Sequence, residues 1–311
     1  MPHDEPRFYS AYGITFASSL KLPEFGPPAP PTADPDVIIC HHHLAYESQT
    51  QINSTSDHIS EFEIDGVGIF HVTTSRIDIY CVSQYIAERL KLYLLGSAIG
   101  ILLMRRKNLV LHGNSIRLGR FALVCVGDSG AGKSTLAAAF LARGFDVLAD
   151  DVVPIDESCK TVAGIPRIKL WKDAAEKLNI DVSSYQRILP GVDKFSVPIK
   201  RRSSTRVPVR WIYSISLGDT DQIMFEPIKG AECLQALHRN TYRGQFLKTS
   251  EMLASHLRIC SSLSSVAKIS TLTRPAVGTD VRTLVDKILT DAVNYQGSDG
   301  DLALNSDASP P

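Results

Sequence analysis

The sequence has no excess of charge of either sign and no closely spaced cysteines. Its 33 Lys and Arg residues balance its 33 Asp and Glu residues. Nucleic-acid-binding domains usually carry a strong basic bias, so no nucleic-acid partner is expected. The 6 cysteines are scattered and form no C-x-x-C pair, which is typical of reduced thiols in the cytoplasm and not of a disulfide framework.

The sequence also lacks a long apolar run. Its most apolar window, residues 92–104, is too short to cross a bilayer and predicts a buried core helix. Residues 1–10 are polar and charged and contain no apolar segment of a signal peptide. With 311 residues, 44% of them apolar, the chain can form one large or two ordinary domains. We therefore expect a cytoplasmic protein without a membrane partner.

The most informative motif is the glycine-rich run GDSGAGKS at residues 127–134, which satisfies the phosphate-binding-loop pattern G-x-x-x-x-G-K-[ST]. Glycines let backbone amides turn toward phosphates without a Cβ clash, and the following helix adds its N-terminal dipole. Lys133 is expected to reach the β- and γ-phosphates, and the Ser134 hydroxyl to bind Mg²⁺. The predicted nucleotide-binding residues are Gly127, Asp128, Ser129, Gly130, Ala131, Gly132, Lys133, Ser134 and Thr135.

The flanking sequence supplies the context that this motif requires. Residues 121–126 are an unbroken apolar run, typical of a buried strand. After the loop, apolar residues recur at helical spacing over 136–141, and Gly144 is expected to end that helix. Strand, loop and helix therefore follow one another as in a nucleotide-binding α/β protein.

The rest of the chain divides into four predicted parts: residues 1–85 (a β-rich N-terminal region), 86–107 (a connecting helix), 108–296 (the core) and 297–311 (a disordered tail). A proline-rich extended loop is expected over 23–35 and one long helix over 84–107. The predicted strands are 62–64, 67–72, 76–81, 109–111, 115–118, 121–126, 145–149, 165–171, 211–217 and 223–227. Further helices are expected over 172–178, 231–264 and 279–294.

Two acids and a histidine are the candidates for catalysis. Asp150 and Asp151 follow the predicted strand 145–149, at whose end a carboxylate would face Mg²⁺ and the γ-phosphate. Two adjacent acids can divide the tasks of holding the metal and orienting the nucleophile, although such a pair can also only mark a turn. His112 follows the strand 109–111 and could tune an aspartate or hold a proton, whereas a lone histidine is more often structural.

Together these motifs resemble the HPr kinase/phosphorylase family. The resemblance rests on residues 111–113 (LHG), the hairpin that follows, residues 127–134 and residues 143–151 (RGFDVLADD), and it covers only about 109–153. It implies an α/β fold with a phosphate-loop kinase core of the HPr kinase/PEP carboxykinase type, ATP and Mg²⁺ as cofactors, and phosphorylation of a protein serine. By position, Asp150 would take the serine proton, Asp151 would hold the metal, and His112 would support the aspartate.

The chain also departs from that family. Thr135 stands where the family has Glu, and the downstream Arg-Gly-rich signature linked to phosphorylase activity is missing. The N-terminal region (YSAYG at 9–13, LPE at 22–24) and IPRIKLW at 165–171 are similar to HPr-kinase-like proteins of lasso-peptide clusters. That similarity implies the C-terminal serine of a precursor peptide as acceptor. HPr kinases assemble as oligomers, which implies some self-association here.

Several basic residues are candidates for binding the acceptor. Arg167 and Lys169 are two apart on a predicted strand and share a face, and Lys194 begins a basic run. A patch of this kind could bind phosphates or an acidic peptide, or could simply be a solvated surface. The run comprises Lys194, Lys200, Arg201, Arg202, Arg206 and Arg210.

Two further features carry no predicted role. In the run His41-His42-His43, no flanking Cys or acid is expected to complete a metal site, and neighbours on a strand alternate faces, so surface positions are expected. Trp171 and Trp211 are interpreted as core residues.

Three functions remain open from the sequence: a serine kinase acting on a peptide or small protein, an ATPase or GTPase that drives a conformational switch, and a nucleotide-bound module that recognises peptides. No N-K-x-D guanine signature is present. An intact set of Lys133, Ser134 and Asp150 favours the kinase over the binding module. The identity of the nucleotide base and of the acceptor stays undetermined at this point.

Overall fold

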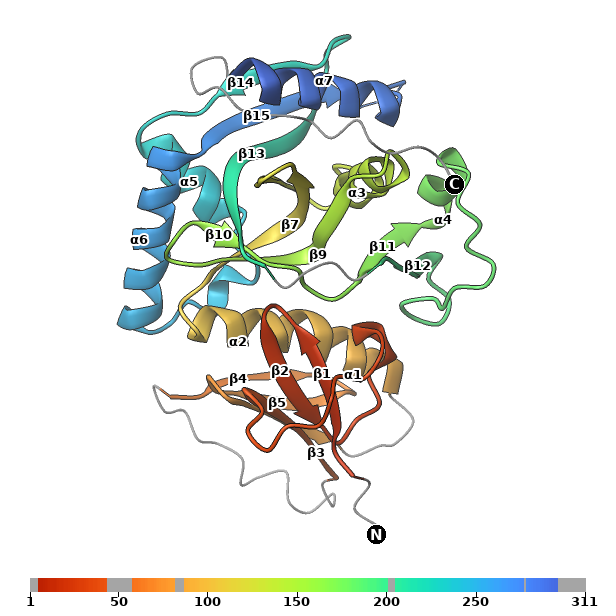
Figure 1. The fold of residues 1–311 in the computed structure, drawn as a ribbon, viewed down its shortest axis with the longest axis vertical. Helices are drawn as coiled ribbons and strands as arrows, with labels where there is room; N and C mark the ends of the chain where they lie inside the picture. Colours follow the sequence, from red (N-terminus) through yellow and green to blue (C-terminus); the bar gives the residue numbers. More distant parts are fainter. Residues whose placement is uncertain (1–4, 44–57, 82–86, 201–204, 277, 296–311) are drawn as a thin grey trace.

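The computed structural model describes residues 5–43, 58–81, 87–200, 205–276 and 278–295. These residues form a mixed α/β structure. A small sheet lies at the N-terminal end, a larger sheet lies above it, and a helix runs between the two (Figure 1). The predicted tail 297–311 and the boundary between the predicted N-terminal region and its helix fall outside the described residues.

The N-terminal sheet has the strand order β1-β2-β3-β6-β5-β4. β3 runs parallel to β2 and β6, and the other pairs are antiparallel. Buried and partly exposed residues alternate along β6, so one face of the sheet is buried. The sequence predicted β4, β5 and β6 to within a few residues, but β1 to β3 only as part of a β-rich region. The strands are β1 (Arg7–Ala11), β2 (Ile14–Ser18), β3 (Val37–His43), β4 (Ser60–Ile64), β5 (Gly68–Val72) and β6 (Arg76–Cys81).

The proline-rich stretch 23–35 contains one short 3₁₀ turn, η1 (Pro23–Phe25), and is otherwise without regular structure. The connecting helix consists of α1 (Ala87–Tyr93), a π-helical segment η4 (Leu94–Ala98) and α2 (Ile99–Arg105). Residues 94–104 are all buried, as the apolar window predicted. The single helix expected over 84–107 is interrupted by the wider π turn and ends at Arg105, while residues 84–86 lie outside the described ranges.

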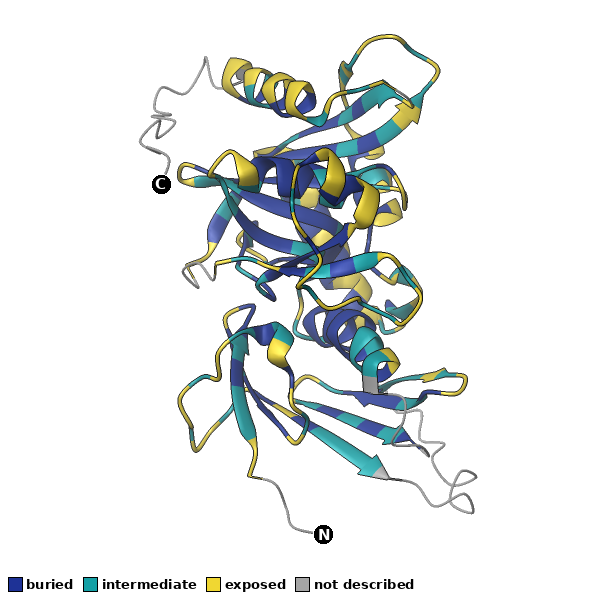
Figure 2. Ribbon diagram, turned by 90° about the vertical axis from the view of Figure 1, so that its right-hand side faces the viewer, coloured by how far each residue is buried: buried dark blue, intermediate teal, exposed yellow. Residues whose placement is uncertain are grey.

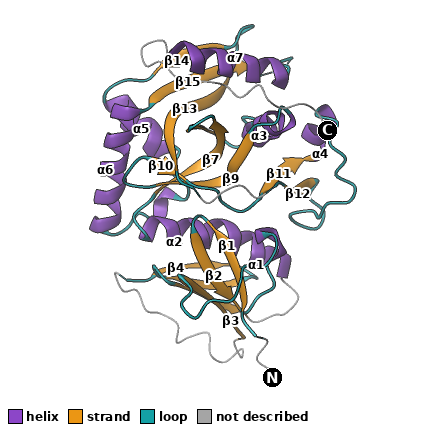
Figure 3. Cartoon of the chain, viewed as in Figure 1, coloured by secondary structure: helices purple, strands orange, loops and turns teal. Residues whose placement is uncertain are grey.

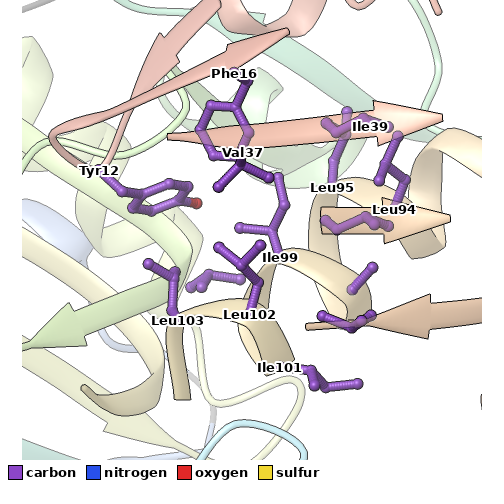
Figure 4. Close-up of a cluster of buried hydrophobic side chains, with 14 of the residues drawn as sticks. Tyr12, Phe16, Val37, Ile39, Leu94, Leu95, Ile99, Ile101, Leu102 and Leu103 are labelled. Atoms are coloured by element: carbon purple, nitrogen blue, oxygen red, sulfur yellow. The ribbon is translucent and has the colours of Figure 1, made fainter. Parts of the chain in front are cut away.

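The helix is buried from both sides. Ile99 and Leu102 belong to one apolar cluster with Phe16 and Val37 of the small sheet (Figure 4). The same cluster includes Val152 of the larger sheet. One continuous core therefore joins the N-terminal sheet, the helix and the rest of the protein.

The larger sheet has the strand order β10-β9-β7-β8-β13-β15-β14. β8, β13 and β15 are parallel neighbours, and β7 joins β8 and β9 antiparallel. β11 and β12 form a separate antiparallel pair. The strands are β7 (Leu109–Leu118), β8 (Phe121–Gly127), β9 (Asp146–Ile155), β10 (Lys160–Thr161), β11 (Arg167–Trp171), β12 (Lys194–Pro198), β13 (Val207–Gly218), β14 (Met224–Pro227) and β15 (Lys268–Pro275).

Helices cover both faces of this sheet (Figure 3). α3 (Lys133–Ala142) and α7 (Val281–Tyr295) bury one face, and α5 (Ala231–Arg239) and α6 (Ser250–Val266) bury the other. α4 (Lys172–Lys177) follows β11. In Figure 2 the central strands are buried, whereas α7 is exposed on its outer side. Among the described residues, no helix is both long and apolar enough to span a membrane.

Two strand predictions in the core are wrong in the same way. The short strands expected at 109–111 and 115–118 are one continuous strand, β7, which pairs with β8 on one side and β9 on the other. The strand expected to end at residue 149 continues as β9 through Asp150 and Asp151 to Ile155. In both cases polar residues inside a strand were taken for its end.

The C-terminal half differs more. The helix expected over 231–264 is broken between α5 and α6, because residues 240–242 leave the helix and bond to the start of β7. β15 was not predicted. Trp211 is fully buried as expected, but Trp171 is 49% exposed. All six cysteines are free thiols and all except Cys40 are buried, as the scattered spacing predicted.

Candidate active site

The glycine-rich loop lies between the end of β8 and the start of α3. Gly127 has φ 140°, and a Cβ there would lie 2.3 Å from the backbone oxygen of Ile215 on β13. Gly132 has φ 94° and precedes the first turn of α3. Both positions therefore need glycine, and the loop places the N-terminus of a helix beside the end of a parallel strand.

Lys133 folds back over this loop. Its ammonium group donates to the backbone oxygens of Gly127 at 2.7 Å and of Asp128 at 2.9 Å. Burial lowers the pKa of Lys133, against the pull of Asp150, Asp151 and Asp128. A buried ammonium ion that has only carbonyl groups as hydrogen-bond partners is well placed to exchange them for phosphate oxygens.

Asn114 hydrogen-bonds to the first residue of α3, next to the loop. This residue of β7 is fully buried, and its amide donates to the backbone oxygen of Lys133 at 2.6 Å. The sequence analysis did not single it out. A polar residue within an otherwise apolar strand was the available signal, but it was taken there as a break between two strands.

The two aspartates lie against the loop and against β11. Asp150 accepts hydrogen bonds from the Ser134 hydroxyl at 3.1 Å and from the backbone N–H of Lys169 at 2.8 Å. Asp151 lies 2.5 Å from the Lys169 ammonium, and its other oxygen lies 3.4 Å from Nδ1 of His112. The structure thus brings Ser134, Asp150, Asp151 and His112 together beside the loop, and it adds Lys169, which the sequence analysis gave as a candidate for binding the acceptor.

The aspartate that His112 contacts is Asp151. His112 was expected to support an aspartate, and its Nδ1 lies beside the carboxylate and the backbone oxygen of Asp151. The reason is the pairing of β7 with β9, which sets His112 opposite Val152 and next to the Gly113–Asp151 pair.

Asp150 and Asp151 lie inside β9 and not at its end. Neighbouring residues of a regular strand point to opposite faces, yet both carboxylates contact Lys169. Asp151 has φ 80°, in the left-handed region that non-glycine residues seldom adopt. This local conformation turns the second carboxylate toward the same side as the first, and backbone strain of this kind is frequent at functional sites.

The two carboxyl groups differ in acidity. Burial raises the pKa of Asp150. Burial acts on Asp151 in the same direction, but the charge of Lys169, together with that of His112 once it is protonated in acid, outweighs burial and lowers the pKa of Asp151 to about 2. Burial also lowers the pKa of His112, which keeps its imidazole neutral at pH 7. One carboxylate is therefore held ionised while its neighbour is more basic than usual.

These residues line a cavity of about 990 Å³. Lys194 of β12 lies on its wall, with its ammonium 5.4 Å from the ring centre of Trp171, and burial lowers the pKa of Lys194. Arg167 lies elsewhere, at a smaller cavity with Glu24 and Glu88. The predicted site residues that line the large cavity are His112, Ser129, Gly130, Gly132, Lys133, Ser134, Thr135, Asp150, Asp151, Lys169 and Lys194.

The chain matches no protein-family model and no curated protein. Among solved structures, it is similar to the HPr(Ser) kinase/phosphatase from Coxiella burnetii. That similarity has a TM-score of 0.30 and 12% sequence identity, and it covers 60% of this chain and 99% of the other. A similarity with a TM-score of 0.30 shows neither the fold nor the activity of this chain. The function is therefore inferred from the geometry of the site.

In the described part of the basic run, Arg206 and Arg210 do not line the large cavity. Arg206 pairs with Asp156 at 2.6 Å, beside a different cavity. Arg210 donates to the backbone oxygen of Val266 at 3.2 Å. Arg201 and Arg202 lie outside the described residues. Of this run, Lys194 lines the candidate site.

Two tyrosines and a glycine lie near Asp151, and the sequence analysis did not identify them as site residues. The ring of Tyr242 lies 5.6 Å from that of His112. A Cβ on Gly96, in the π-helical segment η4, would lie 2.8 Å from the Tyr242 hydroxyl and 3.9 Å from Asp151. Burial raises the pKa of Tyr12 and of Tyr242, and the charge of Asp151 acts in the same direction on both. These three residues do not line the large cavity, but they pack close to the carboxylate of Asp151.

The histidine run needs a correction. An acid does lie beside it, because β3 pairs in parallel with β6: Nε2 of His42 is 2.6 Å from Asp78, and Cys40 is close to both. Arg76, however, donates to Asp78 at 2.6 Å and to Cys40 at 3.2 Å. His41 points to the other face, where its Nε2 lies 2.8 Å from Cys81. The cluster is thus held together by an arginine in the place that a metal ion would take.

Proposed function

We propose that this protein is an ATP-dependent, Mg²⁺-assisted kinase that transfers a phosphoryl group to a serine hydroxyl of a peptide or small protein. The observation that carries the proposal is the meeting of Ser134, Asp150 and Asp151 at the phosphate loop, in one cavity with Lys133. Phosphoryl transfer needs a cradle for the phosphates, ligands for the metal and a group that orients the nucleophile.

The loop fits a nucleotide. Its glycines adopt conformations that turn the chain around an anion, and space around Gly130 is open, since a Cβ there would meet nothing within 4 Å. The donor set beside it, a hydroxyl and two carboxylates, consists of the oxygen ligands that Mg²⁺ prefers. In our proposal Ser134 and Asp151 hold this ion, which would neutralise charge on the phosphates.

Asp150 is the proposed proton acceptor. Its raised pKa makes it the stronger base of the pair, whereas the low pKa of Asp151 suits a permanently ionised ligand. The proton of the serine hydroxyl would pass to Asp150 as the oxygen forms its bond to the γ-phosphorus, and the bond to ADP breaks. Lys133 and the loop amides would stabilise the charge that develops. Because Ser134 contacts Asp150, the aspartate variants are the test that decides between this assignment and the reverse one.

Lys169 and His112 are proposed to hold Asp151 in place. Lys169 binds both carboxylates, one through its backbone and one through its side chain, so it fixes their relative position. Lys194 and the exposed ring of Trp171 form the adjoining wall. We propose that this wall receives the acceptor peptide. Arg167 lies on β11, the strand that ends at Trp171, and is proposed to bind a more distant part of the peptide.

The sequence resemblance supports three finer proposals: the core would be of the HPr kinase/PEP carboxykinase type, the protein would self-associate, and the acceptor would be the C-terminal serine of a lasso precursor peptide. The scattered cysteines support a fourth, that the protein acts in the cytoplasm. Each is separable from the kinase activity, which requires only a serine hydroxyl.

The test uses γ-labelled ATP and Mg²⁺ with serine-terminated peptides, and with matched peptides whose serine is replaced by alanine. Label on the serine peptide and not on its alanine match is the expected result. Release of free phosphate with neither peptide labelled would replace the kinase with an ATPase. Nucleotide binding without label or free phosphate would leave a binding module. Replacing ATP by other labelled triphosphates identifies the base preference.

A further inference from the structure

Arg274 occupies a particular position beside the phosphate loop. It is the residue before Pro275 at the end of β15 and lines the same cavity as the loop. Its Nη2 and Nε donate to the backbone oxygen of Ala131 at 3.1 and 3.4 Å, and its Nη1 donates to that of Pro275 at 3.1 Å. A Cβ on Gly132 would lie 3.1 Å from Nη2. The guanidinium group therefore lies directly on the loop.

Among the described residues, this guanidinium group has carbonyl groups as its hydrogen-bond partners and no carboxylate within ion-pair distance. Burial alone lowers the pKa of Arg274, with no opposing charge. Other arginines of the chain differ: Arg143 pairs with Asp286 at 2.5 Å and Arg206 with Asp156 at 2.6 Å. A partly buried charge without a counter-ion costs free energy, so a partner anion is expected from outside the chain.

We propose that Arg274 binds the phosphate chain of the nucleotide in the loop, as an arginine supplied by the same polypeptide. The inference rests on the proposed function, in that the loop has to bind a nucleotide. A guanidinium group has five N–H donors. Three have the carbonyl partners named above, and the other two have no partner among the described residues. Its planar fork suits phosphate oxygens.

The strand order places Arg274 on the opposite flank of the loop from the aspartates. β8, which leads into the loop, lies between β7 and β13; β9 with Asp150 and Asp151 lies beyond β7, and β15 with Arg274 lies beyond β13. The acceptor side is thus the β9 side, which makes Arg274 a phosphate ligand and not an acceptor ligand. A phosphate chain in the loop would be held by Lys133 from within and by Arg274 from its outer flank.

The experiment compares Arg274→Gln and Arg274→Lys with the wild-type protein. Glutamine retains an N–H group for the Ala131 carbonyl but has no charge, and lysine retains the charge but has no fork. Arg120→Ala is the control, because Arg120 is exposed at the turn between β7 and β8. Dissociation constants are measured for ATP with Mg²⁺ and for inorganic tripolyphosphate, by competition with a fluorescent ATP analogue. Thermal unfolding without ligand checks that each variant is folded.

The expected result is that Arg274→Gln weakens ATP and tripolyphosphate by the same factor, roughly 10- to 100-fold, which is the usual range for hydrogen bonds to a charged group. Arg274→Lys should lose less, and Arg120→Ala should bind as the wild type does. Since tripolyphosphate has no nucleoside, an equal loss on both ligands identifies the phosphates as the partner.

Two results would overturn the inference while leaving the proposed function intact. If Arg274→Gln weakens ATP but not tripolyphosphate, Arg274 contacts the nucleoside. If it binds both ligands as the wild type does, Arg274 only supports the loop. If the wild-type protein binds neither ligand, the proposed function itself fails and this inference with it. If Arg274→Gln does not fold, Arg274→Lys decides the question. Equal weakening of ATP and tripolyphosphate binding supports the inference, and binding of both ligands as in the wild type overturns it.

Discussion

Replacing Asp150 by asparagine tests the proposed mechanism most directly. Asparagine has nearly the same shape and can still accept the hydrogen bond from the Lys169 backbone, but it cannot take a proton. A general base contributes about 10² to 10⁴ in rate, which corresponds to about 2.7–5.4 kcal/mol of activation free energy. We expect transfer to the serine peptide to fall by at least the lower of these factors.

Nucleotide binding should change little in the same variant. Asp150 contacts Ser134 and Lys169, and the carbonyls that bind Lys133 belong to other residues. The assay is a single-turnover measurement of labelled peptide, with the dissociation constant of ATP measured in parallel with and without Mg²⁺. Asp173→Asn is the matched control, since Asp173 lines the same cavity but is exposed and pairs only with Lys177.

Near-normal transfer by Asp150→Asn would refute the assignment of the base. A second outcome is equally informative. If Asp150→Asn loses the Mg²⁺-dependent part of ATP binding while Asp151→Asn keeps it, then the contact of Ser134 with Asp150 reflects a shared metal ion. The two aspartates would then have exchanged roles, and Asp151 with His112 would be the pair that activates the acceptor.

Three further predictions concern binding, pH and packing. Lys133→Ala should weaken ATP binding and lower turnover together, measured by nucleotide titration and peptide labelling; unchanged turnover would argue against the phosphate loop. His256 is 2% exposed, and burial lowers its pKa from 6.5 to about 4. Between these two pH values the unfolded chain binds a proton at His256 and the folded chain does not. The free energy of unfolding should therefore fall by on the order of 2–3 kcal/mol as the pH drops from 6.5 to about 4. Denaturant unfolding at several pH values checks this, and His256→Gln should show a smaller fall. Gly96→Ala puts a methyl group 2.8 Å from the Tyr242 hydroxyl and should lower the free energy of unfolding by about 1–3 kcal/mol through overpacking. Adding Tyr242→Phe should recover most of this stability in the same assay. If the double variant recovers none, the clash is not with the Tyr242 hydroxyl.

The parts of the site that the sequence predicted are contiguous in the chain. β8, the glycine loop and α3 follow one another, so an apolar run, a motif and a helical spacing define them without knowledge of the fold. Asp150 and Asp151 were identified because they follow the first strand predicted after this loop and its helix. Their place inside β9 was not, because the left-handed conformation of Asp151 leaves no trace in the residue types.

The missed parts depend on pairings between distant segments. β15 is rich in Thr and Ser and starts within two residues of the end of α6, so neither alternation nor a turn marked it, and Arg274 was missed with it. The proximity of His42 and Asp78 comes from the parallel pairing of β3 with β6. Trp171 was assigned to the core because tryptophan is usually buried, whereas its position at the end of β11 opens onto the cavity.

The helix from α1 to α2 has a consequence for any attempt to divide the protein. Its apolar residues pack against Phe16 and Val37 on one side and against Val152 on the other, so a fragment starting near residue 108 would expose the apolar surface around Val152. Such a fragment should aggregate or stay unfolded, and the intact chain should melt in a single transition. A destabilising substitution in the small sheet should accordingly lower the proposed kinase activity, although the sheet lies far along the sequence from the phosphate loop.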